Sequence, residues 1–167
     1  KKPVTHQVFY NPEANQRGNE VMQWQQGGYD MEYRMKDNAR EGVDFQLIFP
    51  TQIDIPSQNP GALGAAVARA YNDWAHKLVA GHRDRLSPVA MMPAGCPEEM
   101  PAELRHCVND LGCKASHLVS YTKDKQMDDP AFFPPYQTAQ ELDVPLFCHP
   151  STLGDVGTLI NRQTHFF

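Results

Sequence analysis

The stretch VPLFCHP, residues 144–150, is a short apolar run that ends in a histidine and a proline. Its length predicts a β-strand, and the lack of polar alternation predicts that the strand is buried on both faces, as in a parallel sheet covered by helices. His149 would then lie at the carboxyl end of the strand, where α/β folds place their chemistry. Such a histidine is more often a hydrogen-bonded strand-end residue than a ligand, so the rest of the chain has to decide between the two.

Upstream of this stretch, apolar segments alternate with helical patterns. Strand–helix–strand units of this length close as right-handed parallel crossovers, which predicts an all-parallel sheet with covering helices. The fold class is therefore α/β, either a doubly wound sheet or part of a (β/α)8 barrel, and four strands alone cannot close a barrel. Neither GxGxxG nor GxxxxGK[ST] follows the first strand, which argues against the nucleotide-binding folds. The predicted strands cover residues 43–49, 89–92, 113–121 and 144–148, and the predicted helices cover residues 30–40, 60–81, 97–111 and 128–142.

The long predicted helix carries an amphipathic pattern. Pro60 at its first position would start it, and one apolar stripe would face the sheet. The members of this stripe are Leu63, Val67, Ala70, Trp74 and Leu78.

Composition limits the class of protein and its partners. The chain has 167 residues and a formal net charge of −5, and no basic run is longer than Lys1-Lys2, which argues against a nucleic-acid partner. No apolar run approaches the ~20 residues of a membrane span, so no membrane partner is expected. The four cysteines lack CxxC spacing and are interpreted as reduced core thiols of a cytosolic protein; they are Cys96, Cys107, Cys113 and Cys148.

The domain organisation is predicted as a polar segment over residues 1–28 followed by one barrel-type domain over residues 29–167. The chain starts without a methionine and stops at Phe167 without a helix cap or a polar tail. We therefore expect it to be a segment of a longer protein.

Several segments, taken in order, resemble the amidohydrolase-related metal enzymes, in the branch that contains aminocarboxymuconate-semialdehyde decarboxylase and the resorcylate-type decarboxylases. The likeness runs from Gly28 to Pro150, nearly three quarters of the chain. Order and spacing together carry it, rather than any single motif. The matching segments are residues 28–30, 34–37, 41–51, 71–74, 84–93, 103–114, 128–132 and 142–150.

The resemblance implies a (β/α)8 TIM barrel of the metal-dependent hydrolase type, of which this chain holds about four central βα units. It implies a divalent metal, most often zinc, and makes His149 the metal-ligating histidine after the fifth strand of the barrel. The family's first-strand histidine pair is absent, because His6 has no His, Asp or Glu two residues away. The chain also ends before the sixth strand, so about one of the four usual ligands is present, and a catalytic zinc needs about three.

Three further residues are candidates for substrate binding. Thr51 and Tyr121 would line the mouth of the barrel, and Arg162 would meet a substrate carboxylate, although an exposed arginine is the simpler interpretation. His117 lies mid-strand and is interpreted as a hydrogen-bonded core residue rather than one that points into the barrel. His76 and His106 are interpreted as solvated surface residues.

The resemblance implies non-oxidative decarboxylation, or else hydrolysis, of a small carboxylated aromatic or muconate-like acid, with no catalytic residue assigned. The partner is then a small-molecule substrate, the location is cytoplasmic, and a homo-oligomer is left open. The rival hypothesis is a non-catalytic α/β fragment or degenerate homologue that serves as a binding or assembly module, and the missing metal ligands favour it.

Overall fold

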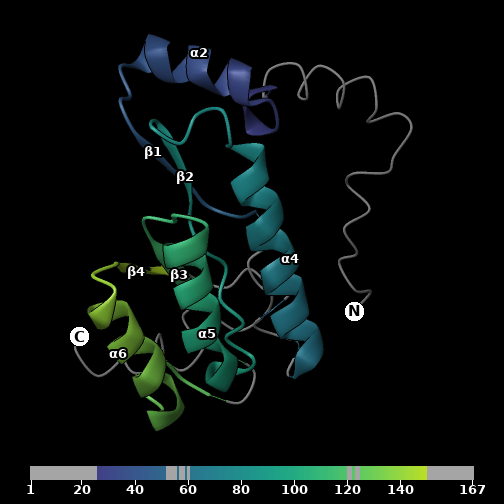
Figure 1. Ribbon diagram of the computed structural model, residues 1–167, viewed down its shortest axis with the longest axis vertical. Coiled ribbons are helices and arrows are strands. Elements are labelled where there is room, and N and C mark those ends of the chain that lie inside the picture. The colour runs from purple at the N-terminus through teal and green to yellow at the C-terminus, as the bar shows by residue number, and fades with distance from the viewer. Residues whose placement is uncertain are drawn as a thin grey trace, which may run out of the picture. The chain divides into compact units, whose positions relative to one another are not determined.

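The computed structural model describes residues 26–51, 56, 59, 61–119, 122 and 125–149, in two compact units that divide between Asp44 and Phe45. In the first unit, helix α2 spans Met31–Glu41 (Figure 1). The Asp30 carboxylate caps it by accepting hydrogen bonds from the backbone N–H groups of Glu32 (2.9 Å) and Tyr33 (3.3 Å). Gly42 ends it with φ 70°, a left-handed conformation that glycine adopts without strain. The helix predicted over residues 30–40 is therefore confirmed to within one residue at each end.

The second unit alternates strands and helices as predicted. All its strand pairs are parallel: β1 pairs with β2 and β3 with β4. A parallel bridge between Ala90 and Ser116 joins the two pairs. The elements are β1 (Gln46–Ile48), α4 (Ala62–Leu78), β2 (Leu86–Pro88), α5 (Met100–Arg105) followed by a π-helical turn (His106–Asp110), β3 (Ser116–Val119), α6 (Phe133–Glu141) and β4 (Leu146–His149).

The strands follow one another in space in chain order, β1 to β4, with no reversal. A doubly wound sheet needs a point where the order reverses, and none occurs within these four strands. Right-handed crossovers that advance in one direction leave the connecting helices on one face of the sheet. The arrangement is that of consecutive βα units of a barrel.

The second strand lies earlier in the chain than predicted. The segment before residue 89 was expected to lead into the strand, but β2 begins at Leu86, and Val89 N–H donates to the Ile48 carbonyl at 2.9 Å. In the sequence, Pro88 indicates the end of a strand, yet β2 includes it. Its missing N–H falls on the side that faces β3, where Ala90 makes the first ladder bond, to the Ala115 carbonyl at 2.9 Å.

The predicted inward stripe of α4 is wrong. Leu63 is 63% exposed and Trp74 is 54% exposed, because the helix is rotated so that its small residues face inward. A side chain on Gly64 would place its Cβ 2.1 Å from the Asn59 carbonyl oxygen, so only glycine allows this close approach. The helix begins after Gly61 rather than at Pro60, which lies outside the described residues. The buried residues are Gly64, Ala68, Asn72 and Ala75.

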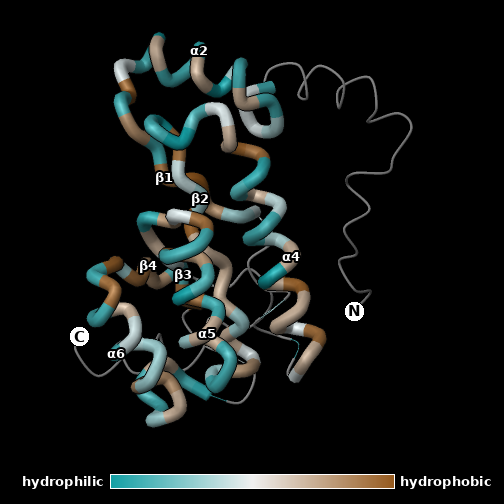
Figure 2. Tube along the Cα trace, in the orientation of Figure 1, coloured by the Kyte–Doolittle hydropathy of each residue, from teal (hydrophilic) through white to brown (hydrophobic). Residues whose placement is uncertain are grey.

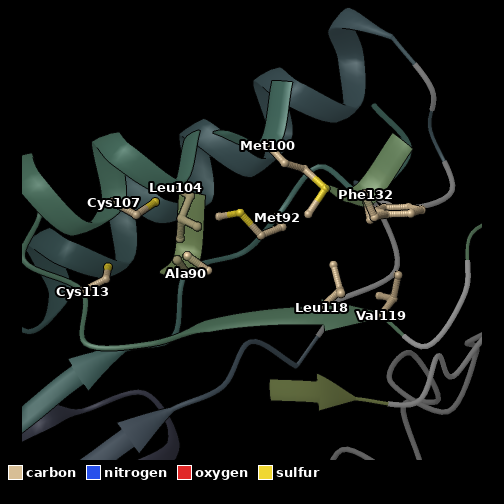
Figure 3. Packing of buried hydrophobic residues seen from close by; sticks show 11 residues of the cluster. Ala90, Met92, Met100, Leu104, Cys107, Cys113, Leu118, Val119 and Phe132 are labelled. Atoms are coloured by element: carbon tan, nitrogen blue, oxygen red, sulfur yellow. The ribbon is translucent and has the colours of Figure 1, made fainter. Parts of the chain in front are cut away.

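The apolar core packs α5 and α6 against β3 (Figure 3). Leu104 of α5 and Leu118 of β3 belong to it, together with Phe132, which is fully buried while its neighbour Phe133 is 57% exposed. The apolar spacing of residues 97–111 and 128–142 predicts an inward stripe on each helix, and the buried residues agree with both. The predicted stripes are Met100, Leu104, Cys107, Val108 and Leu111 in the first helix, and Phe132 or Phe133, Tyr136, Ala139 and Leu142 in the second. Three of the four cysteines are buried as predicted: Cys96, Cys107 and Cys113.

Strand β4 is predicted to be buried on both faces, and the structure does not show this burial. Phe147 is 39% exposed and Cys148 is exposed, although both are apolar (Figure 2). Within the described ranges β4 pairs with β3 alone, so one of its edges has no strand beside it. Among the described helices, none is both long enough and apolar enough to cross a membrane.

Candidate active site

His149 lies where the sequence places it, at the carboxyl end of a parallel strand. It is the last residue of β4, in register with Val119, the last residue of β3, and it is half-buried. Because all four strands are parallel, their carboxyl ends meet at one edge of the sheet. Thr51 follows β1 by three residues and is exposed, so it too lies beyond the carboxyl end of its strand.

The other sequence candidates cannot be placed beside His149. Tyr121, Arg162 and His6 lie outside the described residues. Of the predicted site residues, therefore, the structure describes His149 and Thr51.

An aromatic residue that was not predicted touches His149. The ring centroid of Phe49, directly after β1, lies 6.1 Å from that of His149 with the planes tilted by 35°. It also lies 5.6 Å from the centroid of Phe147, edge to face at 77°. Phe147 and His149 are two residues apart on β4 and so share one face.

The contact of Phe49, just past the end of β1, with side chains of β4 indicates the shape of the sheet. β2 and β3 lie between these strands in the strand order, so Phe49 reaches Phe147 and His149 only if the sheet curls. The face that carries these three rings is the inner, concave one, and the helices cover the outer one. The spacing of two residues along β4 predicts from sequence that Phe147 and His149 share a face. No pattern in the sequence predicts that Phe49 lies beside them.

His117 lies on this inner face as well, because it is in register with Phe147 on the neighbouring parallel strand. It is fully buried, and its Nδ1 lies 3.2 Å from the Ala90 carbonyl oxygen, which accepts the hydrogen bond. The predicted burial and hydrogen bonding of His117 therefore agree with the structure, but the side chain lies on the inner face of the sheet, which the sequence interpretation did not favour. Its ring lies one layer of side chains before His149 along the strand direction.

The described residues alone do not make a complete metal centre. Within the described ranges no group of three His, Cys, Asp or Glu side chains is placed to hold a metal ion. His149 offers one imidazole at the correct edge, and a catalytic divalent centre needs about three protein ligands. His149 thus fits one ligand position, and the remaining ligands would have to come from outside the described residues.

Two histidines predicted as solvated surface residues are instead held by hydrogen bonds. Nε2 of His106 lies 2.8 Å from a carboxylate oxygen of Asp73, and Nδ1 lies 2.9 Å from one of Asp110. Burial lowers the pKa of His106, but the hydrogen bonds to Asp73 and Asp110 outweigh it and raise the pKa above its usual value. Nδ1 of His76 lies 2.7 Å from the Leu111 carbonyl oxygen, which accepts the hydrogen bond.

Both histidines join α4 to the segment after α5, far along the chain from the carboxyl-edge residues. The prediction failed because the partners that join the two helices, Leu111 for His76 and Asp73 for His106, lie 35 and 33 residues away in sequence. They are structural contacts between helices, not parts of the candidate active site.

The family of this chain follows from its similarity to known proteins. The family model described as Amidohydrolase matches residues 5–166. The chain belongs to the amidohydrolase family. The predicted resemblance is confirmed, and so is the fold, a portion of a (β/α)8 TIM barrel.

Among curated proteins, this amidohydrolase is similar to 2-amino-3-carboxymuconate-6-semialdehyde decarboxylase of Dictyostelium discoideum, with 27% identity over 73% of this chain. It is also similar to gamma-resorcylate decarboxylase of a Polaromonas species, with 32% identity over 50% of this chain. The chain spans about a third of the length of these relatives, 34% of the first and 27% of the second.

Among solved structures, the chain resembles dihydroxybenzoic acid decarboxylase from a Polaromonas species, which was crystallised with bound manganese and the inhibitor 2-nitroresorcinol. The TM-score is 0.66 at 21% identity, over 80% of this chain and 42% of that one. At this identity the match supports the fold alone, and it agrees with the consecutive parallel strands described above.

Proposed function

We propose that this chain forms the central βα units of a metal-dependent amidohydrolase-family decarboxylase, which acts on a small carboxylated aromatic or muconate-like acid. In this reaction the bond between the carboxylate carbon and its neighbour breaks, CO2 leaves, and the neighbouring carbon takes up a proton. The observation that carries the proposal is the position of His149 at the carboxyl end of β4, on the curled inner face of a parallel sheet. The names of the relatives support the choice of decarboxylation over hydrolysis.

His149 is proposed as one ligand of a divalent metal. When bound, such a metal would supply a Lewis acid for the substrate or for a water molecule. An imidazole nitrogen suits zinc, which is our first choice, and manganese in the Polaromonas structure makes manganese the alternative.

Thr51, Tyr121 and Arg162 are proposed to bind the substrate. Thr51 supports this role by its exposed position past the end of β1. A guanidinium at Arg162 would pair with the substrate carboxylate through two parallel hydrogen bonds. We further propose a cytoplasmic enzyme with a small-molecule substrate, and residues 29–167 as part of one barrel domain.

The second candidate function is a non-catalytic binding or assembly module. It is favoured by the lack of a three-ligand group within the described ranges. Bound metal in the full-length protein would decide against it.

The test is metal analysis of the full-length protein with and without His149. We expect His149→Ala to remove most of the bound metal and the activity, because a lost ligand weakens the metal site directly. The fold should change little, since the side chain lies at the end of its strand and leaves no core cavity. His82→Ala serves as the control, because His82 lies before β2, at the opposite edge of the sheet, and should leave metal content unchanged.

Circular dichroism would verify that both variants are folded. Unchanged metal occupancy in a folded His149→Ala variant would remove the ligand assignment. If His149 is only a structural strand-end residue, the substitution should cost about 1 kcal/mol through a lost hydrogen bond and leave the metal in place.

A further inference from the structure

Two of the buried cysteines lie together where the π-helical turn after α5 ends. Cys107 is fully buried and Cys113 is 3% exposed, and both are free thiols. The Cys113 N–H donates to the Cys107 carbonyl oxygen at 2.9 Å, because Gly112, with φ 72°, turns the chain back at this point. Both side chains belong to the same end of the apolar core (Figure 3). The turn therefore holds two thiols side by side.

The backbone of this pair allows a disulfide. With standard bond lengths, a 2.9 Å backbone hydrogen bond keeps the two Cα atoms less than about 7 Å apart. Two cysteines farther apart than about 7 Å cannot be joined without backbone movement. The two thiols also hydrogen-bond one another, so their sulfur atoms point toward each other. Formation of a disulfide therefore needs little movement of the chain.

The two thiols differ in acidity. The hydrogen bond from Cys107 lowers the pKa of Cys113 and outweighs burial, which raises it; the nearby His106 lowers it further. The same hydrogen bond, and burial after it, raise the pKa of Cys107. The Glu103 carboxylate adds to this rise, with its Oε1 3.5 Å from the Cys107 Sγ. Because the thiolate is the nucleophilic form, Cys113 is the cysteine that attacks first.

A cavity of about 300 Å³ opens beside Cys113. Leu111, Gly112 and Lys114, the residues on either side of this cysteine, line it. Hydrogen peroxide is little larger than water, whose share of liquid volume is about 30 Å³, so it fits this space. All the lining residues come from the stretch 76–114, so the cavity is formed within the consecutive elements from α4 to the start of β3. It does not belong to the open edge of the sheet beside β4.

We propose that Cys107 and Cys113 are a site of reversible oxidation, at which a small peroxide converts the two thiols into a disulfide. The disulfide would fix the turn that joins α5 to β3. This site is separate from the candidate active site. The cavity beside it is also lined by Leu86, the first residue of β2, and so lies at the amino ends of the strands, whereas His149 ends β4.

The reaction has two steps. The Cys113 thiolate attacks one oxygen of hydrogen peroxide, the O–O bond breaks, and the leaving hydroxide takes up a proton to become water, which leaves Cys113 as a sulfenic acid. The Cys107 sulfur then attacks the sulfenic sulfur, the S–O bond breaks, and the hydroxyl group leaves with the Cys107 proton as a second water molecule. The two thiols lose two electrons in total, and the peroxide accepts them. A small thiol such as glutathione reverses the reaction by thiol–disulfide exchange.

The test is oxidation of the folded full-length protein with hydrogen peroxide, followed by alkylation of the remaining thiols in urea, digestion with trypsin and mass spectrometry. Trypsin cuts after Arg105 and after Lys114, so the peptide of residues 106–114 carries Cys107 and Cys113 and neither of the other two cysteines of this chain. We expect this peptide to lose two hydrogen atoms and to resist alkylation. Dithiothreitol should restore both thiols.

Cys96 is the matched control within the same molecule. It is 1% exposed, but its thiol donates to the Gly61 carbonyl oxygen at 2.9 Å rather than to a second thiol. We expect the peptide of residues 106–114 to be oxidised at least about tenfold faster than Cys96. Cys148→Ser should leave this rate unchanged, which would show that the exposed Cys148 thiol does not carry the oxidation to the pair.

Two variants test the order of attack. Cys107→Ala should stop at the sulfenic acid of Cys113, which dimedone traps, and Cys113→Ala should leave Cys107 reduced. The proposal is overturned if both cysteines of the wild type are still alkylated at a peroxide concentration that oxidises the exposed Cys148. A disulfide that forms only when the peroxide is added in urea overturns it as well, because the pair would then react only in the unfolded chain. Both of these measurements use the wild type and do not depend on whether a variant folds.

Discussion

Helix α5 and the π-helical turn after it contact their neighbours in two different ways, through apolar side chains on one side and through hydrogen bonds on the other. On one side, Met100, Leu104 and Cys107 are fully buried among apolar side chains from β3 and α6. On the other side, Glu103 and His106 meet polar side chains of α4. One short segment therefore joins the barrel helices by apolar packing in one direction and by hydrogen bonds in the other.

The polar side depends on complete pairing. The Glu103 carboxylate is buried, and it accepts hydrogen bonds from Arg69 Nε at 2.6 Å and Asn72 Nδ2 at 2.7 Å. Asn72 Nδ2 also donates to the Met91 carbonyl at 2.9 Å, and Asn72 Oδ1 accepts from the Met91 N–H at 2.8 Å. The amide thus satisfies both backbone groups of Met91, as a neighbouring strand would.

The two sides should differ in how much free energy of unfolding a substitution costs. An apolar contact loses free energy in proportion to the atoms removed and the cavity that remains. A buried polar network loses it when a single partner is removed, because the remaining groups are left without hydrogen bonds in a dry environment. Substitutions on either side should therefore follow different rules.

Leu104→Ala should produce the largest effect, on the apolar side. Leu104 is fully buried, so truncation loses its transfer free energy and leaves a cavity, at a cost of about 3 kcal/mol. Urea unfolding followed by circular dichroism measures it. Leu63→Ala is the matched control, because Leu63 is 63% exposed and should change the free energy of unfolding by less than about 0.5 kcal/mol.

Asn72→Leu should come next, on the polar side. It is close in volume and leaves no cavity, yet the Met91 N–H, the Met91 carbonyl and the Glu103 carboxylate each lose a partner. We expect a cost of about 2 kcal/mol in the free energy of unfolding. Asn109→Leu, at an exposed position after α5, should be close to neutral. A neutral Asn72→Leu would mean that the amide does not act as a strand substitute.

The same contrast explains which parts of the structure the sequence could predict. Apolar spacing identified the buried side of α5, because Met100, Leu104 and Cys107 recur at helical intervals and this pattern needs no knowledge of their partners. At the start of α6 the spacing left Phe132 and Phe133 as alternatives, and the structure buries Phe132. On α4 the same rule failed. The residues that pack there are small or polar, such as Gly64 and Asn72, and a hydrophobicity pattern selects Leu63 and Trp74 instead.

At the candidate site, sequence reasoning placed His149 by its strand-end position and by family resemblance. It missed Phe49, because the contact with β4 arises from the curl of four strands, and no local pattern of residues encodes that curl. It misjudged β4 as buried, because burial of a strand depends on what lies beside it, and within the described ranges β4 has β3 alone.

The smallest effect is expected at His106, where the polar side should depend on pH. Carboxylates only accept hydrogen bonds, so His106 can donate to both Asp73 and Asp110 only as the doubly protonated imidazolium. Burial opposes this charge, but the two carboxylates outweigh it and raise the pKa of His106 in the folded protein; Glu103 nearby adds to the rise and Arg69 reduces it.

A folded pKa above the unfolded value of about 6.5 stabilises the protein fully at pH values below 6.5, and this stabilisation is lost as pH rises through the folded pKa. Asp73→Asn and His106→Gln should therefore lower the free energy of unfolding at pH 5.5 by less than about 1 kcal/mol, since both carboxylates are partly exposed, and should match wild type near pH 9. Urea unfolding at both pH values measures the difference, and an NMR titration of the His106 ring reports its pKa directly. A difference that is equal at pH 5.5 and pH 9 would show that His106 acts through packing and not through its charge.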